Sequence, residues 1–185
     1  MQKRMTMDKY QELAQRTSPD DGHDRIDNGI LGLIGETGEL VDVYKKWQHQ
    51  SGPNAKLPAE KFADELGDVL WYLAELASGM GCSLSSIAGR DFSDLNERAR
   101  KTRAEKTIRS VVTGLSSRAN RLNRAIQMSD NPGAAAQIRW ILMGAARMAY
   151  SIGWTMEEVA ARNIEKLKKR YPNGFDAQIS MGRYE

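Results

Sequence analysis

Apolar residues recur at helical spacing through nearly the whole chain. Between residues 26 and 47 they fall at steps of three and four, and the same spacing returns between residues 62 and 80. Such spacing gathers them along one face of an α-helix. No stretch alternates apolar and polar residues between turn signals, so we expect no strand. The pattern predicts an all-α protein.

Turn-forming residues divide this pattern into separate helices. The loops are rich in Gly, Pro, Asp and Ser, and Gly79 and Gly81 are expected to end one helix. Thr155 and Glu158 have the spacing of a capping box that opens the last helix. The predicted helices span residues 6–17, 24–48, 59–80, 84–103, 105–128, a sixth stretch ending near 152, and a last one ending near 171, before a tail at 172–185. Short connections between them favour an antiparallel helical bundle.

Length and composition fit one globular domain, residues 1–185. The net charge of +3 is too mild to require a polyanionic partner. The chain has no apolar run of the ~20 residues that a membrane-spanning helix needs, and its start lacks the apolar stretch of a signal peptide. The single cysteine, Cys82, suits a reducing compartment, and we therefore expect a cytoplasmic protein without membrane contact.

The chain also carries a weak internal repeat. A shift of 72 residues places 71–98 over 143–170 with 7 identical residues in 28. With a shorter hairpin loop, GLIGETGEL (32–40) aligns with GLSSRANRL (114–122). An acid-bearing hairpin at about 24–80 would then have a degenerate copy within about 105–171, and the bundle would be pseudo-duplicated. In that copy, arginines, a glutamine and a tryptophan stand where the first hairpin has its acids: Arg118, Arg121, Gln137 and Trp140.

Two pairs of acids stand out within the apolar pattern of the first hairpin. Glu36 and Glu39 lie three residues apart, as do Glu65 and Asp68, so each pair projects from one side of its helix. If the two helices pack antiparallel, the pairs can meet. Converging carboxylates would repel one another, and a bound divalent cation would offset that repulsion. Oxygen ligands favour Mg²⁺, with Mn²⁺ as a second choice. Ordinary solvated helix faces are the alternative.

These acids and the segments around them resemble the MazG-like, all-α nucleoside triphosphate pyrophosphohydrolases. The similarity lies in NGILGLIGETGELVDVYKKW (28–47), EKFADELGDVLWYLAEL (60–76), the opening MDKYQELAQRT (7–17) and GWTMEEVAARNIEKLKKRYPNGF (153–175). In single-unit members of that family the stretch after ELGDVLWYLAELA (65–77) runs directly into the last helix, NIEKLKKRYP (163–172). Here about 65 residues between Ser85 and Ser151 intervene, and they coincide with the degenerate copy.

The resemblance implies hydrolysis of a nucleoside triphosphate between its α- and β-phosphates, giving a monophosphate and pyrophosphate. It implies that Glu36, Glu39, Glu65 and Asp68 hold Mg²⁺ and serve catalysis, without saying which acid accepts the proton of water. Related enzymes are dimeric, and we expect a homo-oligomer, most simply a dimer. The substrate-binding candidates are Asn28, Tyr72, Asn163, Lys166, Lys169 and Arg170.

Two non-enzymatic functions remain as alternatives. Basic residues cluster between positions 98 and 109, which would suit a helical nucleic-acid-binding module. No aromatic residues are interleaved with them, so a base-stacking platform is not indicated and nucleic acid is not the expected partner. A catalytically inactive bundle that serves as an assembly partner is the other alternative.

Overall fold

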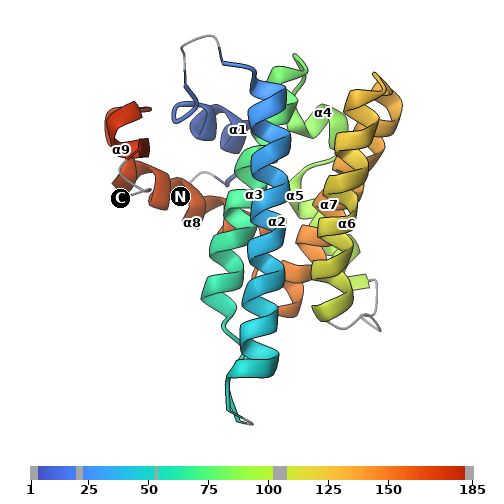
Figure 1. Ribbon diagram of the computed structural model, residues 1–185, viewed down its shortest axis with the longest axis vertical. Helices are drawn as coiled ribbons and strands as arrows, with labels where there is room; N and C mark the ends of the chain where they lie inside the picture. Colours follow the sequence, from blue (N-terminus) through green and yellow to red (C-terminus); the bar gives the residue numbers. More distant parts are fainter. Residues whose placement is uncertain (1–3, 20–22, 53, 102–107, 182–185) are drawn as a thin grey trace.

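The computed structural model describes residues 4–19, 23–52, 54–101 and 108–181, and these form helices and loops without strands (Figure 1). The all-α prediction is therefore confirmed for the described part of the chain. The helices are α1 (Met7–Gln15), α2 (Arg25–Gln50), α3 (Ala59–Gly79), α4 (Leu84–Ala88), α5 (Phe92–Lys101), α6 (Ile108–Gln127), α7 (Asn131–Ser151), α8 (Met156–Arg170) and α9 (Ala177–Met181).

The helices begin and end where local hydrogen bonding favours it. Asp24 caps α2, because its side chain accepts from the backbone N–H groups of Ile26 and Asp27. Thr155 and Glu158 form the predicted capping box of α8. Gly81, just beyond α3, has a φ of +67°, which glycine adopts without strain. These boundaries were readable from the sequence because each depends on residues a few positions apart.

The prediction of one helix over 84–103 was wrong. The chain forms α4 and α5 instead, and Gly89 between them has a φ of +65°, which ends the first helix. The carboxylate of Asp91 then accepts from Phe92 N at 2.8 Å, at the start of α5. It also accepts from Met7 N at 2.8 Å, which ties α1 to this turn. The predicted boundaries at 102–107 lie outside the described residues.

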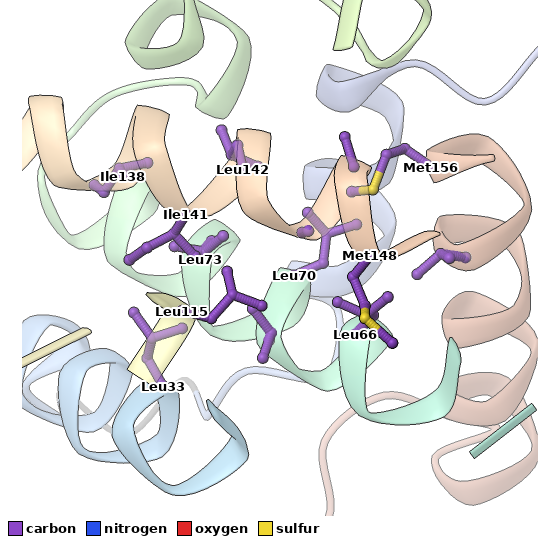
Figure 2. Close-up of a cluster of buried hydrophobic side chains, with 14 of the residues drawn as sticks. Leu33, Leu66, Leu70, Leu73, Leu115, Ile138, Ile141, Leu142, Met148 and Met156 are labelled. Carbon is purple, nitrogen blue, oxygen red and sulfur yellow. The ribbon is translucent and has the colours of Figure 1, made fainter. Parts of the chain in front are cut away.

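Helix α3 runs through the centre of the core and contacts α1, α2, α4, α7 and α8. Figure 2 shows its Leu66, Leu70 and Leu73 packed with side chains from α2, α6, α7 and α8. Leu33 and Leu115 reach this cluster from α2 and α6. Because so many helices bury their apolar faces against α3, any polar residue on its remaining face is held in a fixed position.

The two long hairpins lie side by side. Helices α2 and α3 pack together, as do α6 and α7, and α6 packs along α2 (Figure 1). Helix α8 crosses back to pack on α3 and α1. This arrangement gives the acid-bearing hairpin neighbours on two sides, while the internal duplication itself stays a prediction. None of the helices in the described residues is long and apolar enough to cross a membrane.

Candidate active site

The α2–α3 hairpin brings three of the four predicted acids together. Glu36 of α2 and Glu65 and Asp68 of α3 each offer a carboxylate oxygen, and these oxygens lie within 4.8 Å of one another. All three residues are partly buried. Carboxylate oxygens at this separation suit a hard divalent cation such as Mg²⁺, so the donor set fits the metal that the sequence predicted. They form a candidate metal centre.

Glu39 lies outside this cluster. It is exposed one helical turn beyond Glu36 and is not among the carboxylates that converge within 4.8 Å. Its charge still acts on the cluster, because it helps to raise the pKa of Glu65. The structure therefore groups three acids directly and places the fourth at the margin.

Helix α8 supplies two polar partners for Asp68. Asn163 donates from Nδ2 to Asp68 Oδ1 at 3.1 Å, and Lys166 Nζ donates to Asp68 Oδ2. Both were predicted as substrate-binding residues from their place in the last helix. In the structure they are one turn apart on the face of α8 that meets α3. The Lys166 ammonium is thus positioned at the edge of the acidic cluster.

A buried tyrosine orients Asn163. Tyr10 of α1 donates from its hydroxyl to Asn163 Oδ1 at 2.8 Å, which directs the amide nitrogen toward Asp68. Burial, together with the charge of Asp68, raises the pKa of Tyr10 well above its usual range, so the hydroxyl remains a donor. Gly67 makes room for this contact, because a Cβ there would lie 2.8 Å from that of Asn163. Tyr10 stands in the opening segment MDKYQELAQRT, but no pattern in the sequence marked it as a residue of the site.

The carboxyl group of Glu65 is perturbed by its surroundings. Burial raises its pKa above the usual range, and the neighbouring charge of Asp68 adds to the shift. Lys166 acts in the opposite direction. A cation at the cluster would relieve this repulsion and lower the pKa again.

A cleft of about 190 Å³ opens beside the cluster, lined by Glu36 and Asp68 together with aromatic and polar side chains. It contains three of the predicted substrate-binding residues: Asn28, Tyr72 and Arg170. The remaining lining comes largely from segments that sequence reasoning did not assign to the site: Thr17, Pro19, Trp71, Leu167, Tyr171, Phe175 and Ser180. The YPNGF segment was noticed in the sequence, but only the folded chain brings its aromatic rings to the cleft.

Two side chains are fixed within this cleft. The indole of Trp71 donates from Nε1 to Thr17 Oγ1 at 2.9 Å, and its ring packs edge-on against Tyr72. The guanidinium of Arg170 lies over the ring of Tyr171 at 5.0 Å. An aromatic surface with a cation at its rim is suited to a planar, negatively charged ligand.

The glycines that precede the acids serve helix packing. A Cβ on Gly32 would lie 2.0 Å from the Tyr72 ring, and one on Gly29 would lie 2.6 Å from Leu76. The space that these two glycines leave is occupied by side chains of α3. Because glycine has no side chain, α2 and α3 can approach closely here, and this approach determines the distances among the acids.

Other predicted residues lie elsewhere. Lys169 is exposed and is not part of the cleft lining. Among the basic residues that would suit nucleic acid, Lys101 pairs with Glu97 at 2.5 Å on α5, while Arg103 and Lys106 lie outside the described residues. A pairing within one helix face is what a solvated surface would show.

A buried acid that the sequence did not single out lies behind the cleft. Glu75 has no exposed surface, and its Oε1 accepts from Ser18 Oγ at 2.9 Å and contacts His23 Nε2 at 2.7 Å. Arg25 lies 3.7 Å from its other oxygen. This cluster ties the α1–α2 connection to α3 and so fixes one wall of the cleft.

Comparison with known proteins bears directly on this geometry. The MazG nucleotide pyrophosphohydrolase domain matches residues 26–118, about half of the chain and the part that carries all four acids. The chain belongs to the MazG nucleotide pyrophosphohydrolase family. The resemblance found in the sequence is thereby confirmed, and the protein is placed within a family of hydrolases. The match ends before α8, so the contacts of Asn163 and Lys166 come from the structure alone.

Individual relatives of this MazG-family chain include a phage protein and mammalian enzymes. The gene 37 protein of Mycobacterium phage L5 is 33% identical over 101 residues, which cover 51% of this chain and 89% of the phage protein. Human dCTP pyrophosphatase 1 is 32% identical over 108 residues, 57% of this chain and 63% of the enzyme. The bovine enzyme is 43% identical over 54 residues, 28% of this chain and 32% of its own length. The chain therefore spans less than two thirds of these dCTP pyrophosphatases. No solved structure matches it significantly.

Proposed function

We propose that the protein hydrolyses nucleoside triphosphates between the α- and β-phosphates, with Mg²⁺ as cofactor, and releases a nucleoside monophosphate and pyrophosphate. The observation that carries this proposal is the convergence of Glu36, Glu65 and Asp68 within 4.8 Å beside an aromatic cleft. Three oxygen donors next to a cleft of this kind suit a divalent cation and a phosphate-bearing substrate. Mn²⁺ would be accepted by the same oxygens.

The residues of the site divide into three roles. Glu36, Glu65 and Asp68 would hold Mg²⁺, which when bound offsets the negative charge of the triphosphate. Lys166 and Arg170 would contribute positive charge to the phosphates from α8, and Asn163 keeps Asp68 oriented. Glu39, exposed at the margin, would complete the acidic set once substrate and cation are present. Its assignment rests on the spacing in the sequence.

Hydrolysis adds water across the α–β anhydride bond, and a base must accept one proton from that water. A bound cation lowers the pKa of the carboxylates that hold it, so this role falls to Glu39, the acid at the margin of the cluster. The nucleobase of the substrate would pack against Tyr72, Trp71 and the aromatic residues after α8. The relatives named dCTP pyrophosphatase make dCTP the first substrate to test.

The decisive experiment measures the products and their dependence on the acids. Purified protein is incubated with dCTP and the other nucleoside triphosphates in Mg²⁺, and the products are resolved by anion-exchange chromatography. We expect monophosphate and pyrophosphate in equal amounts. Glu36→Gln and Asp68→Asn should each lower the rate by roughly a hundredfold or more, because each removes an anionic ligand.

Asp42→Asn is the matched control. Asp42 lies on the same helix as Glu36 but is paired with Lys45 and Lys46, and it is not part of the acidic cluster. Its removal should leave the rate within about twofold, since exposed pairs of this kind contribute little. Release of diphosphate and inorganic phosphate, or full activity in both cluster variants, would overturn the proposal.

A further inference from the structure

The second hairpin, α6–α7, repeats the contact geometry of the first with different side chains. The internal alignment pairs Glu36 with Arg118, and Asp68 with Trp140. Arg118 donates to Gln137 Oε1 at 3.1 Å and lies over the Trp140 ring at 4.8 Å. The aligned positions therefore meet across α6 and α7, as the acids meet across α2 and α3.

A pocket of about 140 Å³ lies at this place on the second hairpin. It is lined by Gly114 and Arg118 of α6, and by Trp140, Gly144 and Arg147 of α7, among others. None of its lining residues belongs to the acidic cleft. Its volume is below the ~300 Å³ typical of pockets that enclose a drug-sized ligand, so it would hold a compact group.

The pocket is open because two glycines replace a glycine and a tyrosine. In the first hairpin the Tyr72 ring fills the space over Gly32. The aligned positions are Gly144 and Gly114, and a Cβ on Gly114 would meet nothing within 4 Å. A Cβ on Gly144 would instead lie 2.7 Å from Leu115 Cδ2, so the open space is the one over Gly114.

The charge of this pocket is the reverse of the acidic site. Arg118 stands at the position of Glu36, and Arg147 at the position of Glu75. The Nε atom of Arg147 is buried and has no hydrogen-bond partner among the described residues. A guanidinium group stays protonated and can only donate, so a buried donor of this kind calls for an acceptor.

A neighbouring pocket of about 320 Å³ adds to the positive field and shares Trp140. Arg90 and Arg139 line it, and neither forms an ion pair within the described parts of the chain. Each is held by a backbone carbonyl: Arg90 donates to Ala88 O at 3.3 Å, and Arg139 to Ile87 O at 3.2 Å. Arg90 and Arg139 are therefore positioned before any ligand arrives.

We propose that the α6–α7 pocket is a second binding site, which takes a phosphate-type anion directly between Arg118 and Arg147 without a metal ion. Its ligand is a compact phosphate chain, either free pyrophosphate or the terminal phosphates of a nucleotide. Guanidinium forks match phosphate oxygens in geometry and charge. The site requires no turnover in the acidic cleft, so it stands or fails independently of the proposed hydrolysis.

The test is calorimetric titration of the full chain with inorganic pyrophosphate and with a nucleoside triphosphate, both in EDTA. The wild type should bind each ligand at one site. Arg118→Gln and Arg147→Gln should each weaken binding by about tenfold or more, because a charge-assisted hydrogen bond is lost. Gly114→Val should also weaken binding by filling the pocket while keeping both charges. If the triphosphate binds tightly and pyrophosphate weakly, the ligand of the site is a nucleotide. If the two bind with similar affinity, the site recognises the phosphate chain alone.

Two controls make the outcome decisive. Arg121→Gln removes an exposed arginine from the same helix and should leave the affinity within about twofold. The double variant Glu36→Gln, Asp68→Asn should bind pyrophosphate in EDTA as the wild type does, and circular dichroism checks that every variant is folded. Wild-type protein that binds neither ligand, equal loss in Arg121→Gln, or loss of binding in the acidic double variant would each overturn the proposal.

Discussion

Asp68 shows how closely single residues of the site depend on one another. Its two carboxylate oxygens accept from Asn163 and Lys166 of α8, while the same group lies within reach of Glu36 and Glu65. Tyr10 and Gly67 in turn fix Asn163. The carboxylate is therefore held by hydrogen bonds from one side and repelled by like charges from the other. Lys166 is the internal counter-ion of the cluster.

This arrangement predicts opposite effects of Lys166 on the two ligands. Lys166→Met should tighten Mn²⁺ binding in the absence of nucleotide, by roughly fivefold, because a positive charge beside the metal site is removed. The same variant should weaken nucleotide binding, since a cation for the phosphates is lost. Paramagnetic resonance of Mn²⁺ and nucleotide titration measure the two affinities separately.

Lys168→Met is the matched control for that change, because Lys168 pairs with Glu165 at 2.8 Å on the exposed side of the same helix. It should alter neither affinity by more than about twofold. Weaker Mn²⁺ binding in Lys166→Met would show that the lysine supports the metal ligands and does not oppose the cation.

At the scale of elements, the distance between α2 and α3 governs the site. The two helices approach closely at Gly29 and Gly32, where Leu76 and Tyr72 occupy the space that a side chain would need. The acids lie along the same interface. Helix α8 is held against α3 by Arg162, whose Nε donates to Asp64 Oδ1 at 2.6 Å. A change in helix packing would therefore reach the acidic cluster without touching an acid.

Gly32→Ala tests this dependence. The new Cβ would lie 2.0 Å from the Tyr72 ring, so the helices must separate or the ring must move, at a cost of about 1–3 kcal/mol in the free energy of unfolding. Gly35→Ala is the control, since a Cβ there meets nothing within 4 Å and alanine favours a helix by up to about 1 kcal/mol. Urea unfolding followed by circular dichroism should show opposite signs for the two variants. Equal stability of both would show that the approach of α2 and α3 does not depend on Gly32.

Considered as a whole, the molecule sets two hairpins of opposite charge side by side. The acids lie on α2 and α3, and the aligned positions of α6 and α7 carry arginine, glutamine and tryptophan. Helix α6 packs along α2, so the second hairpin covers a face of the first. The meeting of the aligned positions favours the internal duplication, which stays a prediction, as does the homodimer.

The asymmetry between hairpins predicts a single location for divalent cations in each chain. Titration with Mn²⁺ should show binding that is abolished in the double variant Glu65→Gln, Asp68→Asn, because no other cluster of ligand side chains is found in the described residues. The double variant Arg118→Gln, Arg121→Gln should bind Mn²⁺ as the wild type does. High-affinity Mn²⁺ that remains in the acidic double variant would reveal a second location.

The sequence by itself determined the helices, most of their ends and the identity of the acids. These features depend on residues within a turn or two of one another, as the capping box of Thr155 and the three-residue spacing of Glu65 and Asp68 show. Gly89 was visible too, but whether a glycine bends a helix or ends it depends on what packs around it.

Only the tertiary structure decided which of these residues meet. The rotation of α2 against α3 brings Glu36 into the cluster and leaves Glu39 at its margin. The path of the chain after α8 brings Tyr171 and Phe175 to a cleft whose other walls come mainly from the α1–α2 connection, α2, α3 and α8. Such contacts join segments far apart in the chain, and they are set by the shapes of side chains that pack in the core. A local sequence pattern does not determine how side chains from distant segments pack together.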